Sequence, residues 1–318
     1  MTNFNTYNHI GKKSVLSSVE DNIKAFLDNG FLNIGGFINA VIPANGTNPV
    51  TNLKPVDYPP YKKNTVWQSE RKDWIYESNI DYSNQPISIS GIYVNNNYVL
   101  NLNELTQLEP LSSSAYSYNI NYPLGQIIFT NPQSSSTNVK LNYSYRYIQV
   151  YKSNENIWWK ELQNSTYNPQ KTRIPDGDLQ IFADHRVQLP AIIVEMIPRM
   201  YQTPYQLGSV QNIITQDVLL HIFTNTPQQR SQIVDILIAQ KDKDSFFYDI
   251  DKVVKNNKYF LSKDGSKNVL GLSYKQILQN TAYLTNAFYI ENAIVSEYNQ
   301  FSSNLYNSVV RWTLKIYP

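Results

Sequence analysis

INYPLGQIIF, residues Ile120–Phe129, is the stretch that most clearly sets the fold of this chain. Two similar stretches accompany it, GIYVN at Gly91–Asn95 and VKLNYSY at Val139–Tyr145. β-Branched and aromatic residues alternate along them, and Gly, Pro, Asn and Ser occupy the turns, which is typical of short antiparallel strands. None of the three offers a nucleophile, a metal ligand or a phosphate-binding loop at a usable spacing. They therefore predict a scaffold rather than an active site.

The strand pattern extends over residues 65–151. Val66–Tyr76 and Pro86–Val94 have the same β-rich composition, and turn residues recur at short intervals. Short strands with frequent turns predict a small antiparallel β sandwich or barrel module over residues 65–151.

Residues 1–64 have a different texture. Apolar side chains at near-helical spacing predict an amphipathic helix over Ser14–Asn29, with Gly30 at its C-cap. The next stretch is apolar and broken by glycines up to Ile42, and Pro43–Pro60 is rich in Pro and Asn. We expect an extended arm here, which in an oligomer is suited to lie across a neighbouring subunit.

Residues 152–184 are less regular and are expected to connect the β module to a C-terminal α+β module over residues 185–318. A mixed or antiparallel sheet with helices on one face is expected for that module. Its predicted elements are strands at Leu189–Ile197 and Asp217–Phe223, a helix with Thr226 as N-cap and Pro227 as first residue, a helix at Tyr274–Thr281, and strands at Ala287–Val295 and Ser308–Tyr317. The fold class is therefore α+β.

Composition excludes several classes of function. The 318 residues contain 27 Lys and Arg against 25 Asp and Glu, and no run of like charges, so a basic patch for nucleic acid or a membrane is not expected. There is no cysteine, which excludes disulfides, thiolate catalysis and zinc–thiolate sites. The 25 Tyr suit large uncharged contact surfaces. An AT-rich genome would produce the same enrichment.

Candidate chemistry is sparse. His185 beside Asp184, near Asp176 and Asp178, is the one cluster that resembles a metal or acid–base site. It lacks the ligand count of a calcium loop, and Asp-Gly is a common turn dipeptide, so a turn is the expected structure. His221 lies in an apolar strand and is expected to be a packed, hydrogen-bonded residue.

Glu70, Asp73 and Glu77 share one strand-like segment and are expected to lie on the solvated surface. The sequence has no G-x-S-x-G elbow, Walker pattern or dinucleotide fingerprint. We therefore predict no catalytic, cofactor-binding or metal residues, no cofactor, and no enzymatic activity. The N-terminus lacks a secretory signal and no apolar run reaches the roughly 18 residues of a membrane span, so synthesis in a cytoplasm and no membrane partner are expected.

Several short motifs resemble virion structural proteins of tailed bacteriophages. They are Gly35–Phe37, Val66–Tyr76, Gly91–Asn95, Tyr122–Phe129, Tyr205–Gly208 and Gln216–Phe223. Within that group the C-terminal module looks like neck and tail-terminator proteins, which assemble as rings between capsid and tail. The resemblance implies a homo-oligomeric ring in the virion, assembled in the host cytoplasm. Its implied partners are neighbouring neck, tail or portal proteins, with double-stranded DNA passing through the lumen without specific binding.

Three other interpretations remain open. A baseplate or fibre-attachment protein would use the β module as a docking platform. A carbohydrate-binding or carbohydrate-cleaving tail component is suggested by Trp158 and Trp159, if they are exposed. A two-domain protein unrelated to phages is the third.

Overall fold

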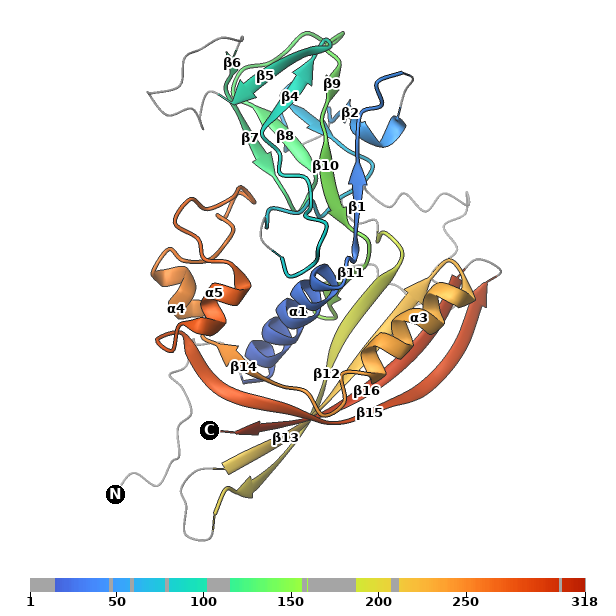
Figure 1. The fold of residues 1–318 in the computed structure, drawn as a ribbon, viewed down its shortest axis with the longest axis vertical. Helices are drawn as coiled ribbons and strands as arrows, with labels where there is room; N and C mark the ends of the chain where they lie inside the picture. Colours follow the sequence, from blue (N-terminus) through green and yellow to red (C-terminus); the bar gives the residue numbers. More distant parts are fainter. Residues whose placement is uncertain are drawn as a thin grey trace. The chain divides into compact units, whose positions relative to one another are not determined.

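The structure is a computed structural model of the chain. It describes residues 15–45, 48–57, 60–77, 80–101, 115–155, 159, 187–206, 212–302 and 305–317. Strands predominate over helices, and the fold is α+β as predicted (Figure 1).

The chain divides into two compact units. One, the sheet unit, comprises residues 1–29, 149–255 and 274–318. The other, the barrel unit, comprises residues 30–148 and 256–273. This division differs from the predicted segments because residues 30–64 and 256–273 join the strands of the barrel unit, whereas most of the N-terminal helix joins the C-terminal sheet.

The barrel unit is built from an eight-stranded sheet in the order β6-β5-β4-β9-β2-β3-β8-β7 and a two-stranded sheet of β1 and β10. All pairings are antiparallel except β5 with β6. The larger sheet curls on itself, which gives the predicted barrel-like module (Figure 1). Its elements are β1 (Phe37–Ala40), a 3-10 turn (Pro49–Thr51), β2 (Asn52–Pro55), β3 (Val66–Gln68), β4 (Gly91–Val94), β5 (Asn97–Asn101), β6 (Ala115–Tyr116), β7 (Tyr118–Asn121), β8 (Gln126–Phe129), β9 (Val139–Lys140) and β10 (Tyr143–Arg146).

Aromatic residues fill the core of the barrel unit. Trp67 and Phe129 meet edge to face at 5.2 Å between ring centroids, and Trp74 lies 4.7 Å from Tyr143. The hydroxyl of Ser69 accepts hydrogen bonds from the Arg71 N–H (2.8 Å) and the Trp74 indole (3.3 Å). Burial raises the pKa of the Tyr143 phenol. This polar centre lets the aromatic rings be buried with their N–H and O–H groups satisfied.

The stretch expected to be an extended arm is part of the barrel unit. β2 pairs with β9 on one side and with β3 on the other, and β1 pairs with β10. The expectation of a free extended arm is thus wrong for these residues, because they form strands that pair within the barrel unit. Pro43 lies outside the strands, where a missing N–H interrupts no ladder.

Residues 256–273 are a second contribution to the barrel unit from far along the chain. The carbonyl of Gly265 accepts a hydrogen bond from the Tyr122 N–H at 3.0 Å. Phe260 stacks on Tyr76 with 5.3 Å between centroids, and Leu261 packs against the aromatic core. Gly265 has a φ of +81°, and a Cβ there would meet the Asn121 side chain at 2.5 Å, so glycine is required at this contact.

The sheet unit has a mixed six-stranded sheet in the order β11-β12-β13-β16-β15-β14. β11 is parallel to β12, and the other pairs are antiparallel. The unit's elements are α1 (Val15–Asn33, whose last turn belongs to the barrel unit), β11 (Gln149–Lys152), β12 (Ala191–Pro204), β13 (Asn212–Thr224), α3 (Pro227–Ile238), β14 (Asp244–Tyr248), α4 (Ile250–Lys255), α5 (Tyr274–Gln279), β15 (Leu284–Ser302) and β16 (Leu305–Tyr317).

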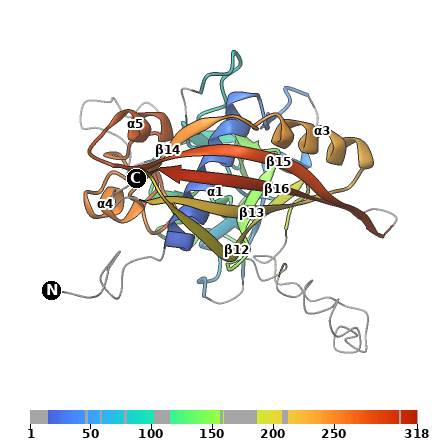
Figure 2. The ribbon, with the colours of Figure 1, turned by 90° about the horizontal axis from the view of Figure 1, so that it is seen from below.

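Helices α1 and α3 cover one face of this sheet. Trp312 on β16 lies 6.3 Å from the ring of Phe26 on α1 and donates its indole N–H to the Leu237 carbonyl on α3 at 3.1 Å. Val218 and Leu220 on β13 are fully buried on the same face. Figure 2 shows the strands in front of α1, so it looks onto the other face.

Helix ends show where local sequence rules held. Thr226 caps α3 by accepting the Gln229 N–H at 3.3 Å, with Pro227 as first residue, which confirms the predicted start. The predicted end of the first helix is wrong, because Gly30 lies inside α1. Gly35 ends the helix instead: it has a φ of +82°, and the Gly35 and Gly36 N–H groups donate to the carbonyls of Leu32 and Phe31, a Schellman motif.

Candidate interaction surface

The face of the six-stranded sheet opposite α1 and α3 is the candidate surface. Register sets its side chains in rows from β13 through β16 to β15, because directly paired residues share a face. The rows are Leu219, Arg311 and Ile294; Asp217, Thr313 and Asn292; and Thr215, Lys315 and Tyr289. We call these nine residues the open face. None is fully buried, and Ile294 is 45% exposed.

Charges on the open face are paired within the chain. The Asp217 carboxylate accepts hydrogen bonds from the Arg311 guanidinium and from the Thr313 hydroxyl, the latter at 2.7 Å. Lys315 Nζ lies 2.5 Å from Glu291 Oε1. Asp217 raises the pKa of Arg311, and Glu291 raises the pKa of Lys315, so both cations remain charged over the physiological range. The two bases of these rows are therefore balanced by two acids, Asp217 within the rows and Glu291 next to Asn292.

One end of this side of the sheet is closed by a small apolar cluster. Trp159 packs on Ile193 and Phe223, and its ring lies 4.4 Å from that of His221. The His221 Nε2 is 2.6 Å from the Glu195 carboxylate. His221 is thus packed and hydrogen-bonded, as predicted. Trp159 is only 7% exposed, which contradicts its expected role as an exposed sugar-binding residue, and Trp158 lies outside the described residues.

The β15–β16 hairpin is fixed to α3 by a cation–π contact. The guanidinium carbon of Arg230 lies 4.4 Å from the ring centroid of Tyr298 and 5.7 Å from that of Tyr306. Register shifts at three points of β15 accompany the curvature of this long strand (Figure 2). The contact holds the outer part of the hairpin against the helix.

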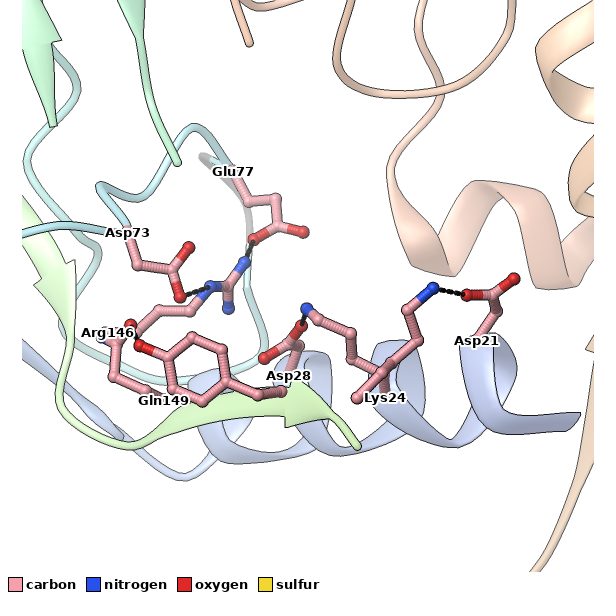
Figure 3. A network of polar contacts seen from close by, with 9 residues as sticks. Asp21, Lys24, Asp28, Asp73, Glu77, Arg146 and Gln149 are labelled. Atoms are coloured by element: carbon pink, nitrogen blue, oxygen red, sulfur yellow. Dashed lines mark hydrogen bonds and ion pairs between the residues drawn. The ribbon is translucent and has the colours of Figure 1, made fainter. Parts of the chain in front are cut away.

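In the barrel unit, the buried Arg146 forms ion pairs with two acids that were predicted to lie on the surface. Arg146 donates through Nη2 to Glu77 at 2.9 Å, and its Nε lies 3.9 Å from Asp73 (Figure 3). The Arg146 side chain is 6% exposed and that of Glu77 is 11% exposed. The expectation of a solvated acid is therefore wrong for Glu77, which pairs with an arginine on β10. Asp73, with a side chain 28% exposed, is only partly buried. Glu70 pairs with Lys54 at the surface, as expected of a solvated acid.

In the sheet unit, α1 is joined to the end of β11 by a second ionic cluster. Lys152 Nζ lies 2.6 Å from Asp21 and 2.5 Å from Glu155. Burial disfavours its charge, but hydrogen bonds to Asp21 and Glu155 more than compensate and raise the pKa of Lys152. Burial also raises the pKa of Glu20, although Ser153 and Asn154 donate hydrogen bonds to its carboxylate. This cluster fixes a helix to a strand.

The predicted metal-like cluster of Asp176, Asp178, Asp184 and His185 lies outside the described residues. Within the ranges that the structure does describe, no group of three or more His, Cys, Asp or Glu side chains could hold a metal ion. No helix in those ranges is long and apolar enough to cross a membrane.

Sequence reasoning missed the residues that make the decisive polar contacts. Arg146, Asn22 and Arg230 act on partners far away in sequence. Only Arg146 could have been noticed in the sequence, because it is a charged residue in a strand whose other residues suit a buried position. A buried cation implies acids nearby, but not which ones.

Comparison with known proteins found no protein-family model and no curated protein that matches this sequence.

Proposed function

We propose that this chain is a non-enzymatic structural protein of a tailed-phage virion, forming an oligomeric ring at the neck, where head and tail connect and DNA passes through. The support for a position at the neck of a virion is the resemblance of its motifs to virion structural proteins. The observation that supports assembly is the open face, a broad sheet surface with its charges already paired. The DNA would pass without specific binding, in keeping with a net charge of +2.

The open face has the chemistry of a protein–protein contact. Arginine and tyrosine are enriched in such contacts. Arg311 and Tyr289 both lie on this face, and Arg311 is directly paired with the exposed Ile294. Burying an unpaired charge is costly, but Arg311 and Lys315 would enter an interface with their carboxylate partners already bound. A ring requires heterologous contacts that close, so a different surface of the next subunit would meet the open face.

The alternative is a baseplate or fibre-attachment protein. The separate barrel unit favours it, since a self-contained β module is suited to docking. A carbohydrate-binding or carbohydrate-cleaving role has less support, because Trp159 is buried against Phe223.

Light scattering and negative-stain imaging of the purified full chain test the proposal. Two variants with equally exposed sites form a matched pair: Ile294→Glu on the open face, where Ile294 is 45% exposed, and Val254→Glu on α4, where Val254 is 47% exposed. We expect rings from the wild type and from Val254→Glu, and no rings from Ile294→Glu, with an unchanged circular dichroism spectrum. A wild type that stays monomeric as its concentration is raised, or rings that survive Ile294→Glu, would overturn the assignment of this face.

A further inference from the structure

Among the strands that the structure describes, none pairs with one of the two hydrogen-bonding edges of β1 in the barrel unit. Its sheet contains only β1 and β10. Two backbone hydrogen bonds show which groups near β10 point toward β1. The Tyr147 N–H donates to Gly36, which directly precedes β1, whereas the Arg146 N–H donates to Asp73 on the other side of β10. Because backbone direction alternates along a strand, Ile38 and Ala40 face β10, while Phe37, Asn39 and Val41 face away.

The ends of this outer edge are already satisfied. The Phe37 N–H donates to the Gly35 carbonyl at 2.8 Å, and the Val41 carbonyl accepts the Asn48 side chain at 3.1 Å. Among the described residues, nothing bonds to the Phe37 carbonyl, to the N–H and carbonyl of Asn39, or to the Val41 N–H. Two donors and two acceptors remain.

These four groups are self-complementary. If a second β1 lies antiparallel with Asn39 opposite Asn39, the two Asn39 residues exchange both of their backbone bonds. Each Val41 N–H then meets the Phe37 carbonyl of the other copy, so four hydrogen bonds form and no backbone group on the edge is left over. A strand of arbitrary register would leave some of these groups unpaired.

The side chains around the edge also favour a second copy. Exposed strand edges are normally protected by lysine, proline or a bulge, but Phe37–Ala40 contains none of these. Ile34, Ile38 and Val41 are 54%, 39% and 50% exposed beside it. Pairing about Asn39 would set Ile38 against Ala40 of the other strand, an uncharged contact.

We propose that two copies of this chain pair antiparallel through β1, about a twofold axis at Asn39, to form a four-stranded sheet with their β10 strands. The contact is isologous, and it is separate from the open face, which belongs to the other unit. On the proposed function, a neck ring would have unlike neighbours on its head and tail sides, so we assign this twofold contact to the free protein.

The absence of cysteine in the chain permits a register-specific test. In Asn39→Cys the two introduced thiols are directly opposite, with Cα atoms about 5.5 Å apart, within reach of a disulfide. In Ile38→Cys each thiol faces Ala40 of the other copy, and the two thiols are separated by roughly 7–8 Å or more between Cα atoms. Under mild oxidation we expect a disulfide-linked dimer from Asn39→Cys and little from Ile38→Cys. Equal yields from both, or none from either, would overturn the pairing.

A second pair of variants tests the backbone edge itself. Asn39→Pro removes the outward N–H, which an edge strand tolerates, whereas Asn39→Ala keeps it and loses only the bond from Ser144 to the Asn39 side chain. In the Ile294→Glu background, which removes the open-face contact, we expect light scattering to show loss of the dimer in Asn39→Pro but not in Asn39→Ala, and retention in both contradicts the proposal. The Ile294→Glu variant tests the ring contact, and the Asn39 variants test the β1 pairing. Either proposal can therefore be refuted while the other stands.

Discussion

Asn22 on α1 completes the outer edge of β14 in the sheet unit. The Tyr248 N–H donates to Asn22 Oδ1 at 2.9 Å, and Asn22 Nδ2 donates to the Tyr248 carbonyl at 3.1 Å. The asparagine amide thus replaces the backbone of a neighbouring strand. Both residues are buried, at 2% and 1% exposure, so water is not at hand to replace these bonds.

Replacing Asn22 by Ala leaves one buried donor and one buried acceptor on Tyr248 unsatisfied. Each costs about 1–3 kcal/mol, and the better helix propensity of alanine returns about 0.6 kcal/mol, so we expect the free energy of unfolding to fall by about 1.4–5.4 kcal/mol. Asn29→Ala is the matched control, since Asn29 lies in the same helix and its side chain has no hydrogen bond to any described residue. That variant should be neutral or slightly more stable.

Urea unfolding followed by circular dichroism measures the stability of both variants, and hydrogen exchange of the Tyr248 amide reports on the site directly. Exchange should accelerate in Asn22→Ala and stay unchanged in Asn29→Ala. A stability within about 0.5 kcal/mol of the wild type, together with unchanged exchange at Tyr248, would show that the edge does not depend on this side chain.

Three further predictions concern other contacts. Gly35→Ala should destabilise the chain by more than about 1 kcal/mol, because φ is +82° and a Cβ would meet the Tyr82 ring at 2.6 Å. Gly30→Ala should stabilise the helix by up to about 1 kcal/mol, because the space around Gly30 is open. Thermal unfolding measures both changes. Arg146→Ala should cost about 3–5 kcal/mol in urea unfolding, since it strands a buried carboxylate; a cost below about 1 kcal/mol would contradict this. Burial raises the pKa of Glu20 above its ordinary value of 4.5, so its contribution to stability is present below pH 4.5 and is lost as pH rises through the folded-state pKa. Glu20→Gln should therefore flatten the pH dependence of unfolding above pH 4.5.

Local patterns in the sequence were enough for elements whose cause is local. Thr226 and Pro227 predicted the start of α3, and the turn residues between apolar runs predicted the hairpins of the barrel unit. The end of α1 was predicted wrongly at Gly30, because the sequence does not distinguish a glycine inside a helix from one just beyond its end. Only the hydrogen bonds of Gly35 and Gly36 distinguish the two.

The contacts that join distant segments could not be predicted. Nothing in residues 256–273 announces that Gly265 will accept a bond from Tyr122, because strand pairing depends on the rest of the fold. The open face was equally hidden: Asp217, Arg311 and Lys315 look like ordinary solvated charges in sequence, and their pairing depends on the register of three strands. A single sequence carries the composition of a surface but not its arrangement.

The chain passes between its two units four times, after Asn29, Ile148, Lys255 and Ser273. Tension applied between the units is consequently divided among four stretches of backbone rather than carried by one linker. Cutting a single peptide bond at any of these points would leave three covalent ties in place, and neither unit could be released intact by one protease cut. Pulling the two units apart therefore loads all four crossings at once, and no single break separates them.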